Sequence, residues 1–201
     1  RSGNPFSVVA DIFGIDDPDF RGGARASLGD VNGDGRVDLV VAAGFEGGPR
    51  VATYDGRTVT GASATPLFND FFAFEETLRN GVFVTVADID GDGKADIVAG
   101  GGPGGGPRVV VYSATTLLQT NELRPLANFF AGDENDRNGV RLATANLRDD
   151  TGDDLIVGSA PGGAAHVFVY RASELTTNSR PVPFRTLDVF DEDFTGGVFV
   201  G

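Results

Sequence analysis

The sequence predicts an all-β fold, and three observations support this prediction. The 201 residues are 40% hydrophobic and include 16 Phe, enough to bury the core of one sizeable domain. Thirty glycines and ten prolines divide the chain into short segments, as tight turns between strands do. Helical periodicity does not extend over more than about two turns anywhere. We therefore expect many short strands.

The composition also limits the classes of partner. The formal net charge is −13 and the pI is near 4.3, which disfavours nucleic acids and anionic membranes, because binding phosphates requires a basic surface. Cysteine is absent, so disulfides and thiol chemistry are excluded. No apolar run approaches the ~18 residues of a membrane-spanning helix, and no signal peptide is recognisable. We expect a soluble, mature or excised segment without membrane insertion.

An internal repeat organises the chain at a constant offset of 58 residues. The offset holds without gaps for aromatic, glycine and acidic positions alike. It divides most of the chain into three units, residues 24–81, 82–139 and 140–197. The positions in register include Phe13, Phe71 and Phe129; Gly23, Gly81, Gly139 and Gly197; Asp38, Asp96 and Asp154; and Tyr54, Tyr112 and Tyr170.

Each unit contains four strand-like runs, which in the second unit cover residues 82–87, 95–100, 108–112 and 126–131. Four short strands in a repeat of this length predict one blade of a β-propeller. The chain then holds about three and a half four-stranded antiparallel blades, because residues 1–23 carry the last strand of a preceding blade, near 7–13, and residues 198–201 begin another. Since propellers close with about 4 to 8 blades, we expect further blades from the same or another chain.

Acidic loops follow the first strand of the first two units. Residues 88–96 read D-I-D-G-D-G-K-A-D, and residues 30–38 read D-V-N-G-D-G-R-V-D. Alternating carboxylates repel one another without a cation, and glycine at the sixth position allows a positive φ that folds the oxygens around one point. This pattern predicts calcium. Extracellular calcium modules bind at about 10⁻⁴–10⁻³ M, so we expect a secreted or cell-surface protein.

An EF-hand or a dockerin would begin with a similar loop. Both need a ligand at the twelfth position, where this chain has Val41 and Ala99. Helices should also follow such a loop, whereas here apolar strand-like runs follow. These two alternatives are therefore disfavoured.

The repeats resemble FG-GAP repeats, the blades of integrin α-subunit propellers and of many bacterial extracellular proteins. The resemblance depends on Phe13-Gly14, on the D-x-[DN]-x-D-G-x-x-D loops, and on G-S-A-P at 158–161 or G-P at 102–103 after the second strand. It implies calcium ligation by side chains at loop positions one, three, five and nine and by the backbone oxygen at seven. The implied ligands are Asp30, Asn32, Asp34, Arg36 and Asp38 in one loop and Asp88, Asp90, Asp92, Lys94 and Asp96 in the other, with Arg36 and Lys94 acting through backbone oxygens.

The third loop, at residues 146–154, departs from this pattern. Arg148 replaces an acidic ligand and Thr151 replaces the glycine. The Arg148 guanidinium could take the place of the cation and pair with an acid of the loop, or it could be an exposed side chain on a degenerate turn. We expect two calcium sites and leave the third open. The residues that keep the pattern are Asn146, Asp150, Gly152 and Asp154, and the acids for Arg148 are Asp150 or Asp154.

No catalytic constellation stands out. His166, the only histidine, aligns with Arg50 and Arg108, so the position requires a basic side chain and does not single out a catalytic base. Acidic clusters recur with the repeat, whereas a catalytic pair should be singular. These clusters and the glycine-rich loops should lie opposite the calcium loops, on the face that we consider the candidate site for a protein or glycan partner. The clusters are Asp16, Asp17 and Asp19; Glu75 and Glu76; Asp133, Glu134 and Asp136; and Asp191, Glu192 and Asp193.

The sequence thus favours a calcium-stabilised extracellular β-propeller that serves as a non-catalytic binding, adhesion or scaffold module. One alternative is the propeller domain of a secreted polysaccharide- or lipid-degrading enzyme, with the active residues elsewhere. Another is a structural subunit of a surface layer or filament. Equal loop lengths in all three units favour the non-catalytic interpretations, because an enzyme should have one repeat with unusual loops.

Overall fold

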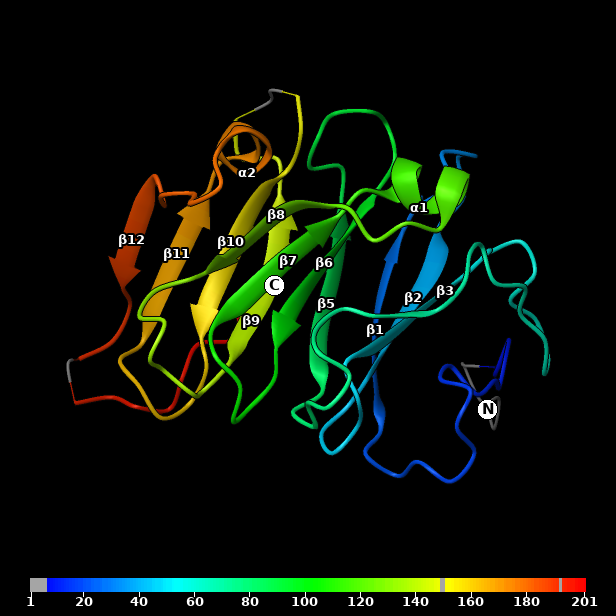
Figure 1. Ribbon diagram of the computed structural model, residues 1–201, viewed down its shortest axis with the longest axis horizontal. Coiled ribbons are helices and arrows are strands. Elements are labelled where there is room, and N and C mark those ends of the chain that lie inside the picture. The colour runs from blue at the N-terminus through cyan, green and yellow to red at the C-terminus, as the bar shows by residue number, and fades with distance from the viewer. Residues whose placement is uncertain (1–6, 149–150, 192) are drawn as a thin grey trace, which may run out of the picture.

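A computed structural model describes residues 7–148, 151–191 and 193–201 (Figure 1). The fold is all-β, with three four-stranded antiparallel sheets in which neighbouring strands follow one another along the chain. The first sheet comprises β1 (Ala24–Gly29), β2 (Asp38–Ala43), β3 (Arg50–Tyr54) and β4 (Phe71–Phe72). The second comprises β5 (Val82–Ala87), β6 (Asp96–Gly101), β7 (Arg108–Tyr112) and β8 (Pro125–Phe130). The third comprises β9 (Val140–Ala145), β10 (Asp154–Ser159), β11 (His166–Tyr170) and β12 (Arg185–Asp188), and two short helices, α1 (Ala114–Thr120) and α2 (Ala172–Thr177), follow β7 and β11.

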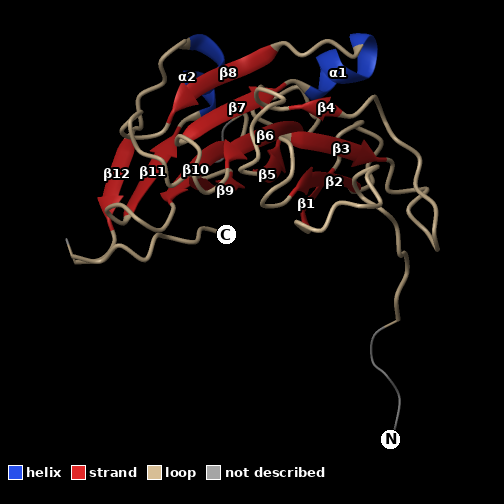
Figure 2. Ribbon diagram, turned by 60° about the horizontal axis from the view of Figure 1, so that its bottom comes forward, coloured by secondary structure: helices blue, strands red, loops and turns tan. Residues whose placement is uncertain are grey.

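The three sheets stand face to face in a curved row (Figure 2). Their first strands lie next to one another, because β1 contacts β5 and β5 contacts β9. These strands begin at Ala24, Val82 and Val140, which are equivalent positions of the sequence repeat. The middle sheet therefore has a neighbour on each side.

Two hydrophobic cores fill the spaces between the sheets. Along β6, Ile97 and Ala99 join the core shared with the first sheet, whereas Val98 joins the core shared with the third. Successive side chains of a strand point to opposite faces, so a sheet with two neighbours needs apolar residues at every position. This explains why β6, after Asp96, is apolar from Ile97 to Gly101 and is buried throughout.

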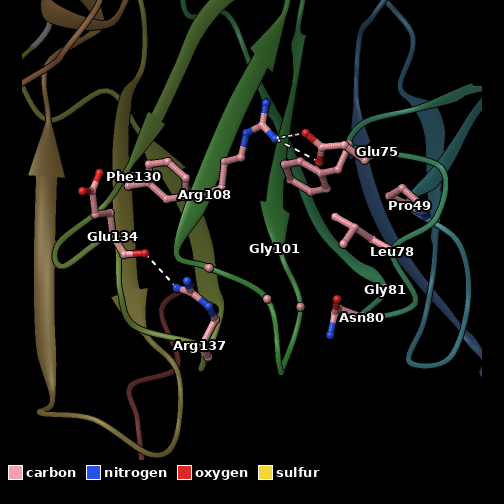
Figure 3. Close-up of a pocket in the computed structure, with 14 residues that line it drawn as sticks. Pro49, Glu75, Leu78, Asn80, Gly81, Gly101, Arg108, Phe130, Glu134 and Arg137 are labelled. Atoms are coloured by element: carbon pink, nitrogen blue, oxygen red, sulfur yellow. Dashed lines mark hydrogen bonds and ion pairs between the residues drawn. The ribbon is translucent and has the colours of Figure 1, made fainter.

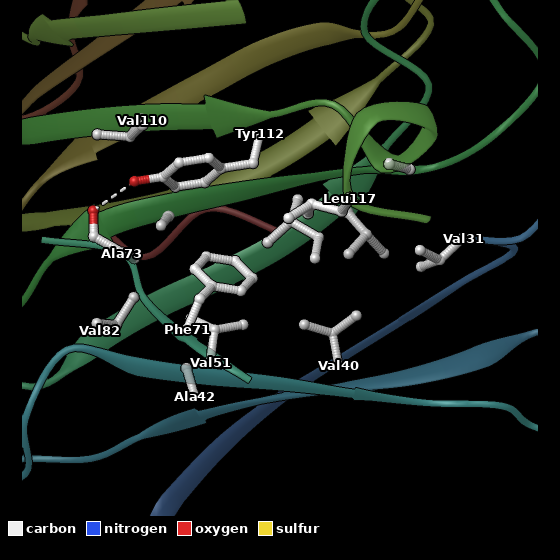
Figure 4. Packing of buried hydrophobic residues seen from close by; sticks show 14 of the residues in the cluster. Val31, Val40, Ala42, Val51, Phe71, Ala73, Val82, Val110, Tyr112 and Leu117 are labelled. Carbon is white, nitrogen blue, oxygen red and sulfur yellow. Dashed lines mark hydrogen bonds between the residues drawn. The ribbon is translucent and has the colours of Figure 1, made fainter. Parts of the chain in front are cut away.

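An aromatic pair recurs at each of these interfaces. Phe71 of β4 packs edge-on against Tyr112 of β7, with 5.1 Å between the ring centroids. The Tyr112 hydroxyl donates a hydrogen bond of 2.8 Å to the backbone oxygen of Ala73 (Figure 4). Phe129 and Tyr170 form the equivalent pair at 4.8 Å. The end of one sheet is thereby joined to the third strand of the next sheet.

The predicted strands of the second unit agree closely with the structure. Those at 82–87 and 108–112 coincide with β5 and β7, and the other two are shifted by one residue. The helices were not predicted, because six or seven residues are too few for a recognisable apolar period. In α1, the Ser113 side chain caps the first turn by accepting a bond from the Thr116 amide.

The two outer strands that the sequence predicted are not formed in the described residues. Within 7–13, only Ala10 makes a single-residue bridge, to Gly61, because the chain there lies against a loop and has no strand to pair with. Residues 198–201 also form no strand, yet the Val198 amide donates a bond of 2.8 Å to the Ser159 oxygen at the end of β10. Assignment of these two segments to further blades stays a prediction.

Replacing Tyr112 by Phe tests the bond between the sheets. The substitution keeps the ring in the core but leaves the Ala73 oxygen without its donor, so we expect the free energy of unfolding in urea to fall by about 1–3 kcal/mol. Tyr170→Phe is the matched control, because among the described residues its hydroxyl donates no hydrogen bond, and we expect a change within about 0.5 kcal/mol. Equal losses in both variants would contradict this role of the hydroxyl.

Candidate functional site

The acidic loops lie at one end of the sheets. Residues 30–37 join β1 to β2, and residues 88–95 join β5 to β6. The helices α1 and α2 lie at this same end, since β5 and β7 run in the same direction (Figure 1). Gly91 and Gly93 have φ of +77° and +87°, a region that other residues rarely adopt, so glycine is required for this turn.

The first aspartate of each loop folds the turn around itself. Asp88 accepts hydrogen bonds from the amides of Gly91 at 2.7 Å, Asp92 at 3.1 Å and Gly93 at 2.9 Å. Such side-chain to backbone bonds are the usual means by which aspartate fixes a turn. Asp30 makes the same three bonds, to the amides of Gly33, Asp34 and Gly35.

The ninth-position aspartate has a second role that the sequence did not predict. Asp96 is completely buried. Its Oδ2 accepts bonds from the amides of Ile89 and Asp90, at 3.1 and 3.3 Å, and its Oδ1 accepts from the Ala114 amide at 3.0 Å. It thus ties the acidic loop to the segment that follows the third strand. Asp38 does the same through the amides of Val31, Asn32 and Gly56.

Three carboxylates converge in the second loop. Asp88, Asp90 and Asp96 each place an oxygen within 4.8 Å of the others. Burial raises the pKa of Asp96 to about 7, and burial together with the charge of Asp92 raises the pKa of Asp90. The ionised forms therefore cost free energy without a cation. A site with oxygen donors only is suited to a hard cation such as calcium.

The fifth-position carboxylates lie outside this group. Asp92 accepts a hydrogen bond from the Thr115 hydroxyl and lies 3.7 Å from the Lys94 ammonium. In the first loop, Arg57 lies 3.0 Å from Oδ2 of Asp34, an atom that is buried and accepts no hydrogen bond from the described residues. Asn32 stands there at the third position, so an amide replaces a carboxylate. Ligation through the backbone oxygens of Arg36 and Lys94 stays a prediction.

The third loop places Arg148 at the buried acid. Its Nη2 lies 3.0 Å from Oδ1 of Asp154 and its Nε lies 3.3 Å from Oδ2. Only 1% of the Asp154 side chain is exposed. The guanidinium therefore donates to Oδ2 of Asp154, whereas in the other two sheets the equivalent oxygen accepts bonds from loop amides. Asn146 accepts a bond from the Arg148 amide. Asp150, the other predicted partner, lies outside the described residues.

Neighbouring loops are also bonded to one another. The Asp30 backbone oxygen accepts a bond of 2.8 Å from the Ala95 amide, and the Asp88 oxygen accepts one of 2.6 Å from the Asp153 amide. Each bond joins the loop of one sheet to the residue that precedes the buried acid of the next. A cation held in these loops would therefore stiffen the joint between sheets as well as the turn.

The opposite end of the sheets carries a pocket of about 230 Å³ (Figure 3). Phe74, Leu78 and Phe130 form its apolar walls, together with the backbone of the glycine-rich loop between β6 and β7. Arg108 donates to both carboxylate oxygens of Glu75, at 2.8 and 3.1 Å. Bonds from its own backbone amide and from Arg108 hold the pKa of Glu75 below its usual range.

This pocket has counterparts at the ends of the other sheets. One is lined by Arg50 and Arg79, and another by His166 and Asp133. His166 lies 2.6 Å from Asp188 and so occupies the position of the aligned arginines. A second basic series, which the sequence analysis missed although it has the same period, consists of Arg21, Arg79 and Arg137, each of which donates to two backbone oxygens of the turn before it.

Comparison with known families matches residues 30–99 to the family described as FG-GAP-like repeat. The match begins at the first residue of one acidic loop, includes the whole of the second loop and ends within β6. Comparison with curated protein sequences gives no match. Within the described residues, no helix is long and apolar enough to cross a membrane.

Solved structures share the fold of this chain. The crystal structure of exotype rhamnogalacturonan lyase YesX aligns with a TM-score of 0.50 and 18% identity, over 82% of this chain and 32% of that chain. Rhamnogalacturonan lyase YesW aligns with a TM-score of 0.49 and 18% identity, over 84% and 34%. The chain thus spans about a third of the length of these structures. The first likeness supports a β-propeller-like arrangement of the three sheets.

A reciprocal exchange at the third loop position tests the cation site. Asp90→Asn removes one of the converging carboxylates, so we expect at least tenfold weaker calcium binding in calorimetry but a higher melting temperature in the presence of chelator. Asn32→Asp should produce the opposite changes in the first loop. If both variants bind calcium as the unchanged chain does, these side chains are not ligands.

Replacing Arg148 by Ala tests whether it compensates the buried acid. Loss of its bonds to a buried carboxylate should lower the free energy of unfolding by about 1.5–3 kcal/mol. Arg57→Ala removes a more exposed ion pair and serves as the control, with an expected loss below about 1 kcal/mol. Calcium titration should fit two sites in the unchanged chain. Three equal sites would contradict the replacement of a cation by Arg148.

Proposed function

We propose that this chain is a calcium-stabilised part of an extracellular β-propeller that acts as a non-catalytic binding module. The observation that carries the proposal is the convergence of Asp88, Asp90 and Asp96 in a loop that also joins two sheets. The FG-GAP-like repeat supports an extracellular location, since such repeats are typical of extracellular proteins. The pronounced acidic charge is consistent with calcium as a partner.

Calcium in this proposal has a structural role. Asp88, Asp90 and Asp96 would hold it in the second loop, and Asp30, Asn32 and Asp38 are the equivalent residues of the first. The ion would neutralise carboxylates that otherwise repel one another and whose burial is costly. The third sheet would need no ion, because Arg148 supplies positive charge at Asp154.

Binding is assigned to the opposite end of the sheets. The pocket beside Arg108 combines aromatic walls with a few oriented polar groups, which is the usual make-up of a small ligand site. The low pKa of Glu75 keeps its carboxylate ionised, so it is poorly suited to act as a general acid. A sugar ring of a glycan, or an apolar side chain of a protein, matches this pocket in size and chemistry.

The alternative function is a propeller part of a polysaccharide-degrading enzyme. It is favoured by the fold likeness to an exotype rhamnogalacturonan lyase, of which this chain covers about a third. Catalytic residues would then lie outside this chain or on its glycine-rich face. Release of shorter products from rhamnogalacturonan by the chain itself would favour this alternative, whereas binding without cleavage would favour the module.

Removal of calcium tests the structural part of the proposal. An ion that binds only the folded state stabilises it by about 2.7 kcal/mol per site at a free concentration one hundred times Kd, so chelation should lower the melting temperature substantially. Chelator that is saturated with calcium beforehand serves as the control and should change nothing. A melting curve that is unaffected by free chelator would remove calcium from the function of this chain.

A further inference from the structure

The second residue of each first strand forms a series that alternates in chemistry. Arg25 in β1, Phe83 in β5 and Arg141 in β9 occupy this position, and Phe199 is the next equivalent residue. The first strands lie side by side, so the series runs across the edge of the molecule where they gather. It belongs to the end of the sheets that carries the glycine-rich loops, opposite the acidic loops.

These four side chains form a stack. The Arg25 guanidinium carbon lies 3.8 Å from the centre of the Phe83 ring, and that of Arg141 lies 3.9 Å from the same centre. Two guanidiniums cannot share one ring face at this distance, so they lie on opposite faces. Arg141 also lies 5.0 Å from the centre of the Phe199 ring. All three distances are within the range of cation–π contacts.

Among the described residues, neither guanidinium is paired with a carboxylate. In the described parts of the chain, no acidic group lies within salt-bridge distance of Arg25 or Arg141, although the protein has 29 acidic residues. Each donates one hydrogen bond to a backbone oxygen, Arg25 to Val82 at 2.9 Å and Arg141 to Val140 at 3.1 Å. A guanidinium has five N–H donors, so most of the donors of Arg25 and Arg141 make no hydrogen bond to the described residues.

The arrangement is electrostatically unfavourable as it stands. Burial lowers the pKa of Arg25 and of Arg141, and the charge of Arg141 lowers that of Arg25 further. The Nε of Arg141 is buried and makes no hydrogen bond to the described residues. Cation–π contacts at partly exposed sites are weak, so they do not explain why two like charges flank one ring. An anion bound beside the edge of the Phe83 ring, within reach of both guanidiniums, would neutralise both charges.

We propose that Arg25 and Arg141 form a binding site for an oxyanion-bearing ligand at the edge where the first strands gather. Carboxylates, sulfates and phosphates all match the planar donor pattern of guanidinium groups. The Phe199 ring is 78% exposed, so one of its faces is available to a ring attached to the anionic group. An acidic sugar presents both parts, whereas an inorganic anion presents only the first.

The test measures melting temperature against anion concentration, with saturating calcium and with ionic strength held constant by sodium chloride. The probes are sulfate, glucuronate and, as the neutral control, glucose. We expect saturable increases with sulfate or glucuronate and none with glucose. At least tenfold tighter binding of glucuronate than of sulfate supports an acidic sugar as the ligand, and equal binding supports a free inorganic anion.

Variants separate this site from general effects of salt. Arg25→Gln and Arg141→Gln should each weaken the anion response at least tenfold, whereas Arg180→Gln, which changes an exposed arginine away from the stack, should leave it intact. Without anions, the Arg25 and Arg141 variants should melt no lower than the unchanged chain, because like-charge repulsion is relieved. An identical anion response in all variants would overturn the proposal. Lower melting of the two stack variants without an anion-dependent difference would also overturn it, since the stack would then serve stability alone.

Discussion

The structure depends on a buried carboxylate in each sheet. Asp38, Asp96 and Asp154 are completely buried, and each accepts a hydrogen bond from the segment after the third strand of its sheet. Burial of a carboxylate costs several kcal/mol unless donors or a cation compensate it. The first two sheets supply loop amides and an acidic loop suited to calcium, and the third supplies Arg148. The form of each loop follows from this requirement.

In our proposals, structural support and ligand binding lie at opposite ends of the sheets. The end with the acidic loops is tied by hydrogen bonds within each loop and between neighbouring loops. The other end carries the pocket beside Arg108 and the unneutralised pair of Arg25 and Arg141. Carboxylates whose burial is costly lie at the first end, where loop amides, Arg148 and, in our proposal, a cation compensate them. Groups with unused donors or apolar walls lie at the second, where a ligand can reach them.

The sequence was sufficient to predict the all-β fold, most strand positions and the acidic loops. The reason is that a repeat places the same residue types at the same structural positions, so glycines and aspartates such as Gly93 and Asp88 mark each turn. It was not sufficient for the helices, which are too short to show a period, or for the second role of Asp96, which depends on a backbone amide 18 residues later. The stack of Arg25 and Phe83 was not predicted, because the equivalent positions of successive repeats alternate between arginine and phenylalanine. Alignment of the repeats therefore shows no common residue type at this position.

The middle sheet couples the packing of the two outer sheets. Its β6 contributes alternate residues to two separate cores, so Val98 and Ile97 connect the packing of the first sheet to that of the third. Among the described residues, the middle sheet therefore connects the packing of the two outer sheets. Under the proposed calcium binding, loss of the ion would affect the first two sheets, whose buried acids belong to acidic loops, whereas the third sheet secures its buried acid with Arg148. The order in which the sheets lose stability would then depend on a single residue, Arg148.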